Sequence, residues 1–339
     1  MKAVVWVEKG KIEIQERPVP ARRPDEVLIR VKSTGICGSD ITIINGKHPR
    51  AKAPLILGHE FMGIVEEIGP GGDGTLKAGD RVVVEPLLSC GVCRPCLRGN
   101  EHVCEHLRLL GVETDGAFTR YVSVPRKRVY PLPDRVPDEA GAIVEPMAVA
   151  IHSVTAGTPE ADDTVVIVGA GPIGIMAAET AAALGVRKVC LFEVNPFRIS
   201  LAESLGLTVF DSREHDMVET AMSYTEGKGA DILIDAAGIS ALVDSFIPMT
   251  AIKGRIMMTA LHKVPAPLLF RELSYKEISI IGTRIYARGD YETALELLRT
   301  GRMDIRPLVT HTFPMSEAVS AFDTAMTDPE ACKIVINQE

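Results

Sequence analysis

A short apolar run that ends in three spaced glycines constrains the fold of this chain more than any other feature. Residues 164–174 have the sequence TVVIVGAGPIG, which continues into the helical pattern IMAAETAAALG. In a strand–turn–helix unit with the pattern G-x-G-x-x-G, the first glycine makes the tight turn and the second lets the backbone approach a pyrophosphate. The third glycine lets the helix pack on the strand. The predicted phosphate-binding loop contains Gly169, Gly171, Pro172, Ile173 and Gly174.

The next strand-like segment ends in a carboxylate. Glu193 closes the segment VCLFE, 19 residues after Gly174, where an acid typically binds the ribose 2′-OH of a dinucleotide. A carboxylate at this place repels a 2′-phosphate, so the pattern favours NAD(H) over NADP(H), although the nearby cation of Arg198 weakens this preference. The alternative is a strand, turn and helix with a purely structural role.

The order of strand-like and helical patterns indicates two domains, which is also what 339 residues suggest at about 150 residues per domain. The first 150 residues contain short β-rich runs separated by Gly, Pro and Asp. From Thr164 onwards, strand patterns alternate with helical ones, as in a doubly wound parallel sheet. We therefore expect an α/β protein with a β-rich domain and a doubly wound domain.

Four cysteines lie close together in the Gly- and Pro-containing loop LLSCGVCRPCLRGNEHVCEHL, with the spacing C-x2-C-x2-C-x7-C. Four thiolates in a short loop match the tetrahedral environment of a structural zinc ion. Two disulfides, four unrelated thiols and an iron–sulfur cluster are the alternatives. Such a site stabilises a loop that has no core of its own, or supports a subunit contact. The predicted ligands are Cys90, Cys93, Cys96 and Cys104.

A second set of metal-ligand residue types is dispersed along the chain. Cys37 occurs in GICGSD, His59 and Glu60 occur in GHE, and Glu145 occurs in VEPMAVAIH. Cys, His and carboxylate are the ligand types of an open, catalytic zinc site, although each residue alone is more often part of a core. Asp40 is a candidate for orienting the imidazole of His59, and otherwise an N-cap or turn residue.

Charge counting limits how these residues can share one ion. The Cys37 thiolate and one carboxylate neutralise Zn²⁺, whereas a second carboxylate makes the ion a weaker Lewis acid. We therefore expect either Glu60 or Glu145 to bind directly and the other to bind loosely or through water. Water or substrate is expected in the open position.

Composition and charge exclude several classes of function. The chain has 37 basic and 45 acidic residues and no long basic run, so we expect no nucleic-acid partner. The N-terminal segment lacks an apolar signal region, and the apolar residues 164–186 are interrupted by Glu179 and a Gly-Pro pair, so we expect no membrane span. Seven cysteines without a secretory signal predict a reducing, cytoplasmic location. A small molecule is the expected partner.

Taken together, these motifs resemble those of the zinc-dependent medium-chain alcohol dehydrogenases over essentially the whole chain. The segment GHEFMGIVEEIG at 58–69 is similar to the zinc signature of that family, and GICGSD, the four-cysteine loop and the glycine pattern accompany it. Glu145 followed by Pro146 resembles the sorbitol (polyol) dehydrogenase branch. The segments LGVETDGAF, VTHTF and CKIVI resemble bacterial L-galactonate and L-gulonate 5-dehydrogenases.

The resemblance implies a specific organisation of the chain. A GroES-like catalytic domain is expected at 1–147 and 285–339, with a structural zinc lobe at 88–106, and a Rossmann NAD-binding domain at 148–284. The resemblance further implies an active cleft between the domains, two zinc ions per subunit, one catalytic and one structural, and a homodimer or homotetramer.

The resemblance also assigns roles to single residues. Ser39 resembles the hydroxyl that starts the proton relay, and Arg284 in GTRIY resembles an arginine that contacts substrate in polyol dehydrogenases. Thr42 stands where many relatives have a histidine, which removes a relay or substrate contact at that position. The glycine-rich insertion at 70–80 is a further departure and is expected to be a surface turn.

The expected reaction is reversible, NAD-linked oxidation of a secondary alcohol to a ketone. Zinc lowers the pKa of the hydroxyl, a serine passes the proton on, and the hydride goes to the nicotinamide. The expected substrate is a polyol or a hexonate such as L-galactonate or L-gulonate, with Arg284, Arg288, His48 or Lys47 as candidates for holding a carboxylate. The alternatives are an L-threonine 3-dehydrogenase, a butanediol-type dehydrogenase, a zinc-free quinone reductase, and a non-catalytic protein that senses NAD or zinc.

Overall fold

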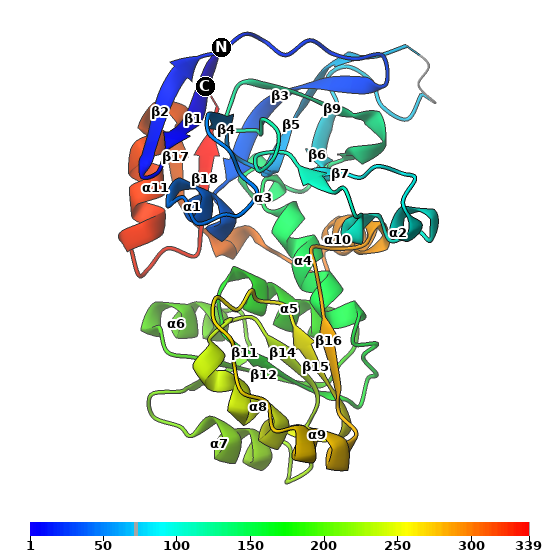
Figure 1. Cartoon of the computed structure of the whole chain (residues 1–339), viewed down its shortest axis with the longest axis vertical. Helices are drawn as coiled ribbons and strands as arrows, with labels where there is room; N and C mark the ends of the chain where they lie inside the picture. The colour runs from blue at the N-terminus through cyan, green and yellow to red at the C-terminus, as the bar shows by residue number, and fades with distance from the viewer. Residues whose placement is uncertain (71–73, 339) are drawn as a thin grey trace. The chain divides into compact units, whose positions relative to one another are not determined.

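The computed structural model describes residues 1–70 and 74–338. Residues 71–73 of the expected surface turn at 70–80 lie outside the described residues. The chain divides into two compact units, one of Met1–Pro146 with Leu298–Glu339 and one of Met147–Leu297. The first unit therefore contains both the N-terminal and the C-terminal parts of the chain (Figure 1).

The first unit is built around a seven-stranded sheet. Its strands are β3 (Glu26–Gly35), β5 (Glu60–Ile68), β6 (Arg81–Val84), β9 (Tyr121–Pro125), β10 (Val129–Pro131), β17 (Val309–Pro314) and β18 (Lys333–Asn337). Their order is β10-β6-β5-β3-β18-β17, and β9 pairs with β3. Apolar side chains of these strands, such as Val27, Ile29 and Phe61, form one buried core. The antiparallel pairing of β18 with β3 places the C-terminal strand beside the N-terminal segments.

Smaller elements complete the first unit. One three-stranded sheet has the order β2-β1-β4, and β7 pairs with β8. These strands are β1 (Lys2–Glu8), β2 (Lys11–Glu16), β4 (Leu55–Ile56), β7 (Leu87–Leu88) and β8 (Arg108–Leu109). The helices are α1 (Gly38–Ile44), α2 (Arg94–Leu97), η1 (Glu101–Val103), η2 (Arg126–Arg128), α3 (Asp138–Gly141), η4 (Arg306–Leu308), η5 (Met315–Glu317) and α11 (Ala318–Thr327). Helix α4 (Val144–Thr155) begins in the first unit and continues into the second.

The second unit is a doubly wound parallel sheet. Its strands are β11 (Thr164–Val168), β12 (Lys188–Glu193), β13 (Thr208–Asp211), β14 (Ala230–Asp235), β15 (Thr250–Met258) and β16 (Ser279–Gly282). The order is β13-β12-β11-β14-β15-β16, and every neighbouring pair is parallel. All residues of β11 are buried, as expected for a strand covered on both faces. The order reverses direction between β11 and β14, which makes their carboxyl ends the expected ligand-binding edge.

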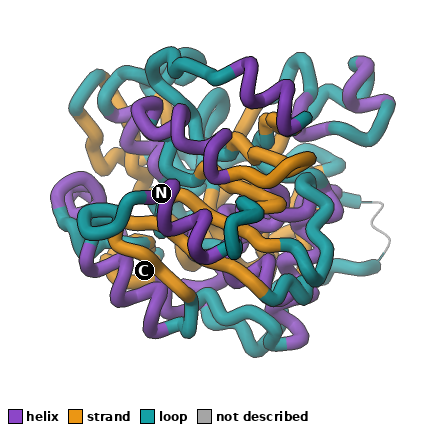
Figure 2. The backbone as a smooth tube through the Cα atoms, turned by 90° about the horizontal axis from the view of Figure 1, so that it is seen from below, coloured by secondary structure: helices purple, strands orange, loops and turns teal. Residues whose placement is uncertain are grey.

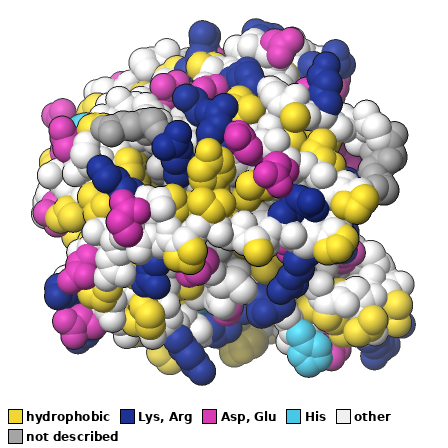
Figure 3. Space-filling model, turned by 90° about the horizontal axis from the view of Figure 1, so that it is seen from above, with side chains coloured by type: hydrophobic (Ala, Val, Ile, Leu, Met, Phe, Trp, Pro, Cys, Tyr) yellow, Lys and Arg dark blue, Asp and Glu magenta, His cyan; other side chains and the backbone are white. Residues whose placement is uncertain are grey.

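Helices connect the strands of this sheet. They are α5 (Pro172–Ala183), α6 (Pro196–Ser204), α7 (Met217–Tyr224), η3 (Ser240–Leu242), α8 (Val243–Met249) and α9 (Phe270–Lys276). Helix α10 (Arg288–Thr300) follows the last strand of this sheet and ends in the first unit. Figure 2 distinguishes the helices of the chain from its strands by colour. The β-rich unit and the doubly wound unit confirm the predicted fold class. No helix in the described part of the chain has the length and apolar character needed to cross a bilayer. On the face seen in Figure 3, basic side chains are interspersed with acidic and apolar ones and form no continuous basic track.

Candidate active site

The dispersed ligand types come together where β3 and β5 pair. Cys37 is the N-cap residue of α1, directly after β3, and the pairing of Gly35 with Glu60 brings this turn beside the start of β5. The Cys37 Sγ, a ring nitrogen of His59 and a carboxylate oxygen of Glu60 all lie within 4.8 Å of one another. A Cβ at Gly35 would lie 2.4 Å from Glu60 Oε2, so the close approach of this carboxylate requires glycine there.

Both edges of the His59 ring face residues named by the sequence. Its Nδ1 lies 3.9 Å from Oδ1 of the fully buried Asp40, which also accepts a hydrogen bond from Cys37 N at 2.9 Å. Its Nε2 lies 3.3 Å from Ser39 Oγ. Asp40 therefore lies where it can fix the ring orientation, which leaves Nε2, on the Ser39 side, available to a metal ion.

The electrostatics of this pocket favour a cation. Burial alone lowers the pKa of His59, but the charges of Cys37, Asp40 and Glu145 outweigh burial and raise that pKa well above its ordinary value. Burial also raises the pKa of Asp40, and the charge of His59 offsets part of that rise. Buried Oε1 of Glu60 has no hydrogen-bond partner among the described residues. A largely buried, electron-rich cluster with a carboxylate oxygen that lacks a hydrogen-bond partner fits a zinc ion.

Glu145 lies in the same electrostatic environment but outside the tight cluster. It is buried near the start of α4, and its charge acts on both His59 and Lys333. The group whose ligand atoms lie within 4.8 Å contains Glu60 and not Glu145. Both carboxylates thus act on the same pocket, and within the described residues Glu60 belongs to the tight cluster with Cys37 and His59.

Lys333 is a residue of the site that the sequence analysis missed. It is the first residue of β18, is 5% exposed, and forms an ion pair with Glu60 Oε2. Its ammonium also donates to Ile36 O at 3.1 Å. Burial lowers the pKa of Lys333, but Glu60 and Cys37 outweigh that effect and raise it. The only sign of this role in the sequence was the single lysine before the apolar residues of CKIVI. A lysine at the end of a strand is ordinarily interpreted as solvent-exposed.

The four-cysteine loop has the geometry of a zinc centre. All four Sγ atoms lie within 4.8 Å of one another, and Sγ–Sγ distances include 3.4 Å for Cys93–Cys96, 3.7 Å for Cys93–Cys104 and 4.0 Å for Cys90–Cys96. A tetrahedron with Zn–S bonds of about 2.3 Å has S–S edges of about 3.8 Å. A disulfide would require about 2.05 Å, and all seven cysteines are free.

Thiol chemistry in this loop also points to a cation. The N–H groups of Val92 and Cys93 lower the pKa of Cys90 to about 6, whereas burial and the hydrogen bond with Cys93 raise the pKa of Cys96 to about 12. The four sulfurs therefore cannot all be thiolates near neutral pH unless a cation compensates their charge. Zinc supplies that compensation.

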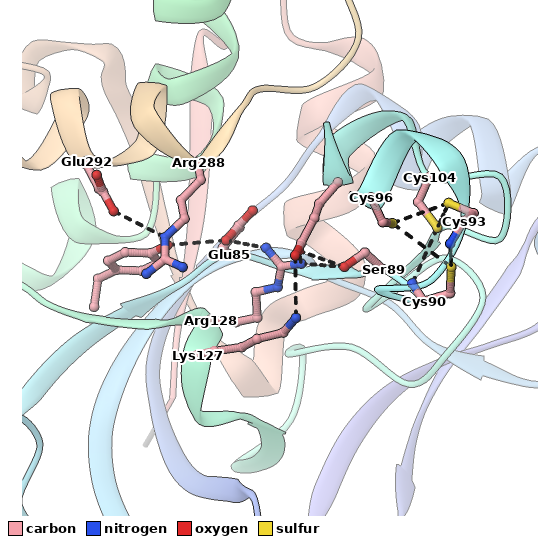
Figure 4. A network of polar contacts seen from close by, with 12 residues as sticks. Glu85, Ser89, Cys90, Cys93, Cys96, Cys104, Lys127, Arg128, Arg288 and Glu292 are labelled. Atoms are coloured by element: carbon pink, nitrogen blue, oxygen red, sulfur yellow. Dashed lines mark hydrogen bonds and ion pairs between the residues drawn. The ribbon is translucent and has the colours of Figure 1, made fainter. Parts of the chain in front are cut away.

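A buried arginine fastens the cysteine loop to the sheet (Figure 4). Arg128 is 3% exposed and pairs with Glu85 at 2.7 Å. Its other terminal nitrogen donates to Ser89 Oγ at 2.8 Å and to Glu101, which lies in η1 inside the cysteine loop. Lys127 adds a longer ion pair to Glu101 at 3.7 Å. The loop is thus held by charge as well as by its sulfur cluster.

The glycine loop of the second unit has the expected dinucleotide-binding geometry. Gly169 has φ +99°, and a Cβ on Gly174 would lie 1.9 Å from Gly169 O, so both positions require glycine. A Cβ on Gly171 would meet nothing within 4 Å, which leaves its backbone open to a ligand. Pro172 and Ile173 begin α5, whose N-terminus therefore follows this open position.

Glu193 ends β12 and braces the glycine loop. Its Oε2 accepts from Ala170 N at 2.8 Å, and its Oε1 accepts from Val194 N at 2.7 Å and Asn195 N at 3.0 Å. Arg198 lies in the first turn of α6, and its buried Nε has no hydrogen-bond partner among the described residues. These residues surround the position predicted for the adenosine ribose.

The remaining sequence candidates lie outside these clusters. Arg284 is exposed in the second unit and has no ion pair with another residue in the described ranges. Thr42 Oγ1 donates to Gly38 O at 2.9 Å inside α1. A role for Arg284 in substrate binding stays a prediction.

Comparison with known proteins identifies the family. Residues 23–134 match the alcohol dehydrogenase GroES-like domain, and residues 172–300 match the zinc-binding dehydrogenase domain. The chain is 32% identical to 2-dehydro-3-deoxy-L-galactonate 5-dehydrogenase of Pseudoalteromonas atlantica, covering 99% of this chain and 98% of the relative. It is 35% identical to a sorbitol dehydrogenase of Halalkalibacterium halodurans, covering 99% of each chain. It is also 35% identical to an L-threonine 3-dehydrogenase of Bacillus velezensis, covering 95% of each.

The fold agrees with that of a solved cofactor complex. An alcohol dehydrogenase from Escherichia coli in complex with NADH superposes with a TM-score of 0.92 at 29% identity and covers 99% of each chain. The two family domains together span more than half of the chain. The first contains both zinc-type clusters, and the second begins at Pro172 inside the glycine loop. The chain belongs to the zinc-dependent medium-chain alcohol dehydrogenases, in their polyol branch, and is an NAD-dependent dehydrogenase.

Proposed function

We propose that this enzyme reversibly oxidises a secondary hydroxyl of a sugar acid, such as L-galactonate or L-gulonate, or of a polyol, to the ketone. The observation that carries the proposal is the Cys37–His59–Glu60 cluster, in which His59 and Glu60 are buried, with the Ser39 hydroxyl 3.3 Å from the His59 ring. The similarity to a deoxygalactonate dehydrogenase and to a sorbitol dehydrogenase supports this substrate class.

Cys37 and His59 would hold the catalytic zinc, and Asp40 would fix the His59 ring from its Nδ1 side. When bound, zinc supplies Lewis acidity that lowers the pKa of the substrate hydroxyl. Because Ser39 Oγ lies beside His59 Nε2, Ser39 would accept the hydroxyl proton and pass it towards solvent. Burial of Asp40 and His59 excludes water from the Nδ1 side of the ring.

The ion pair with Lys333 supports different roles for Glu60 and Glu145 at the zinc ion. Its ammonium neutralises the charge of Glu60, so the Cys37 thiolate and Glu145 would balance the two charges of zinc. Glu145 would then be the firmly bound carboxylate, while Glu60, tied to Lys333 through Oε2, would approach the ion with Oε1 when the open position is empty.

The second unit would bind NAD(H) with its pyrophosphate at the Gly169–Gly174 loop and its adenosine ribose at Glu193. The open side of Gly171 and the carboxylate at the end of β12 support this placement. Arg198 would lie beside the ribose, and Glu193 would disfavour a 2′-phosphate. We further propose a cytoplasmic location, in line with the seven free thiols. We also propose a homodimer or homotetramer, as the family resemblance implies.

The decisive experiment follows NADH formation by zinc-loaded enzyme. The panel contains L-galactonate, L-gulonate, sorbitol, butane-2,3-diol and L-threonine, each with a chelator-treated control. We expect turnover of hexonates or polyols that is lost with chelator and reduced at least about 100-fold in Ser39→Ala, the order that general acid–base groups contribute. Thr42→Ala, in the same helix, is the matched control and should retain activity. Preferential turnover of L-threonine or butanediol would refute the substrate class, and tight NAD binding without any turnover would favour a sensing protein.

A further inference from the structure

Three loops touch one another at the carboxyl edge of the parallel sheet. The glycine loop follows β11, and its Gly169 lies so close to the loop after β14 that an added Cβ would be 3.1 Å from Ala237 Cβ. The loop after β14 in turn touches the loop after β15, because a Cβ on Gly238 would be 3.0 Å from Ala260 Cβ. The three loops therefore form one continuous surface beside the point where strand order reverses.

A chain of polar contacts joins the second and third loops. Asp235, fully buried at the end of β14, lies 2.6 Å from His262 Nε2 through its Oδ2. Its Oδ1 accepts from Ala237 N at 3.1 Å and Gly238 N at 2.9 Å. The other ring nitrogen of His262 lies 3.1 Å from Ser240 Oγ. The imidazole is thus fixed at both nitrogens, with a side chain only 17% exposed.

Ser240 ties the same histidine to the loop that follows it. Its hydroxyl donates to Val264 O at 2.8 Å, two residues after His262. Asp235, Ser240 and His262 therefore cross-link the segments after β14 and β15 through side chains, in addition to the backbone bonds from Thr259 N and Ala260 N to Asp235 O. None of these residues is needed for zinc or for the adenosine ribose as proposed above.

Apolar side chains stand exposed beside this cross-link. Ile239 is 49% exposed, Leu261 is 89% exposed and Val264 is 61% exposed. They occupy the two loops that the polar chain joins, next to residues that are fully or largely buried. An apolar, flat ligand group would cover such side chains.

The direction in which a bound dinucleotide lies along the sheet decides which of its groups covers these apolar side chains. Glu193 ends β12, on one side of β11, and marks the adenosine end, while the pyrophosphate belongs at the glycine loop of β11. The rest of the molecule must extend across the reversal point, towards β14 and β15. That is where the cross-linked loops and the exposed apolar side chains lie.

We propose that Asp235, His262 and Ser240 form a latch that fixes the loops after β14 and β15 as the binding surface for the nicotinamide riboside half of the cofactor. His262 acts as a positioning residue, because it holds the loops in place through Asp235 and Ser240. The inference depends on NAD binding and is independent of which alcohol the enzyme oxidises.

The test compares two ligands that share the adenosine half. Affinities of NADH and of ADP-ribose, which lacks the nicotinamide, are measured by calorimetry for wild type, His262→Ala and His262→Gln. We expect His262→Ala to weaken NADH binding on the order of tenfold, the worth of one hydrogen bond to a charged group, with ADP-ribose binding unchanged. His262→Gln, whose amide can still donate to Asp235, should restore most of the NADH affinity.

Two outcomes would overturn the latch. One is unchanged NADH affinity in His262→Ala, and the other is an equal loss for NADH and ADP-ribose, which indicates general damage to the unit. His215→Ala is the matched control, because His215 is an exposed histidine of the same unit that stacks edge-on against Phe210. It should leave both affinities unchanged.

Discussion

Replacing Arg128 by methionine removes the cation that joins the cysteine loop to the seven-stranded sheet. Methionine retains most of the side-chain volume, so the change isolates the charge. Among the described residues, Glu85, which is 2% exposed, then keeps only the Tyr130 hydroxyl at 3.4 Å as a side-chain partner, and Glu101 loses its buried partner. Breaking a buried ion pair from one side costs about 3–5 kcal/mol, since the remaining charge stays buried without compensation.

This cost is large enough to measure by calorimetry of the zinc-loaded protein. In a unit of this size, each kcal/mol shifts Tm by roughly 2–4 °C, so Arg128→Met should lower the Tm of the first unit by about 10 °C. Adding Glu85→Gln removes the stranded charge and should recover a substantial part of the loss. The cysteine loop should also release zinc to a chelator faster, because Glu101 no longer anchors it.

The matched control is Arg306→Met. Arg306 pairs with Asp304 at 2.6 Å, but both side chains are exposed, so solvent screens the pair and Tm should not change. If Arg128→Met changed Tm as little as Arg306→Met does, burial of the Arg128 pair would not be the source of its stability. If Glu85→Gln deepened the loss in the double variant, the reasoning about a stranded charge would be refuted.

Three further predictions concern single residues. Lys333→Met should destabilise the metal-free protein by about 3–5 kcal/mol, because Glu60 stays buried without its cation. Zinc binding should therefore raise the Tm of this variant more than it raises the Tm of wild type. An equal rise in Tm in both proteins would contradict this. Cys96→Ser should reduce bound zinc from two ions to one per chain by elemental analysis, and retention of both would exclude a four-thiolate site. Burial raises the pKa of Asp290, but hydrogen bonds, including the one with His152, outweigh burial and lower that pKa overall. The ionised Asp290 side chain therefore stabilises the folded state above pH about 4, and this stabilisation is lost as the pH falls through the lowered pKa. The urea midpoints of wild type and Asp290→Asn should therefore differ at pH 7 and converge in acid, and a gap that persists would disprove the link.

The parts of the site that depend on local sequence were predictable. The glycine loop and the cysteine loop are each determined within a short segment, so spacing alone indicates their geometry. The Cys37–His59–Glu60 cluster is different, because it forms only when β3 and β5 pair, and its interpretation relied on the recognised family motifs.

Contacts between residues far apart in the chain could not be predicted from the sequence. Lys333 and Glu60 are 273 residues apart, and nothing local marks a lysine at a strand end as buried. The His262 latch was missed for a related reason, because Asp235 and His262 meet only through the order of parallel strands. Neither pair leaves a periodic pattern that single-sequence reasoning can detect.

The position of β18 in the sheet has a consequence for how the enzyme matures during synthesis. Residues Met147–Leu297 form a contiguous unit that can fold as soon as it has been translated. The first unit, by contrast, must leave its sheet open beside β3 until β18 has been made. Until then Glu60 lacks the ammonium of Lys333, so the nascent catalytic pocket carries an uncompensated negative charge. The NAD-binding unit is therefore expected to be complete on the ribosome before the chemistry of the zinc pocket becomes available.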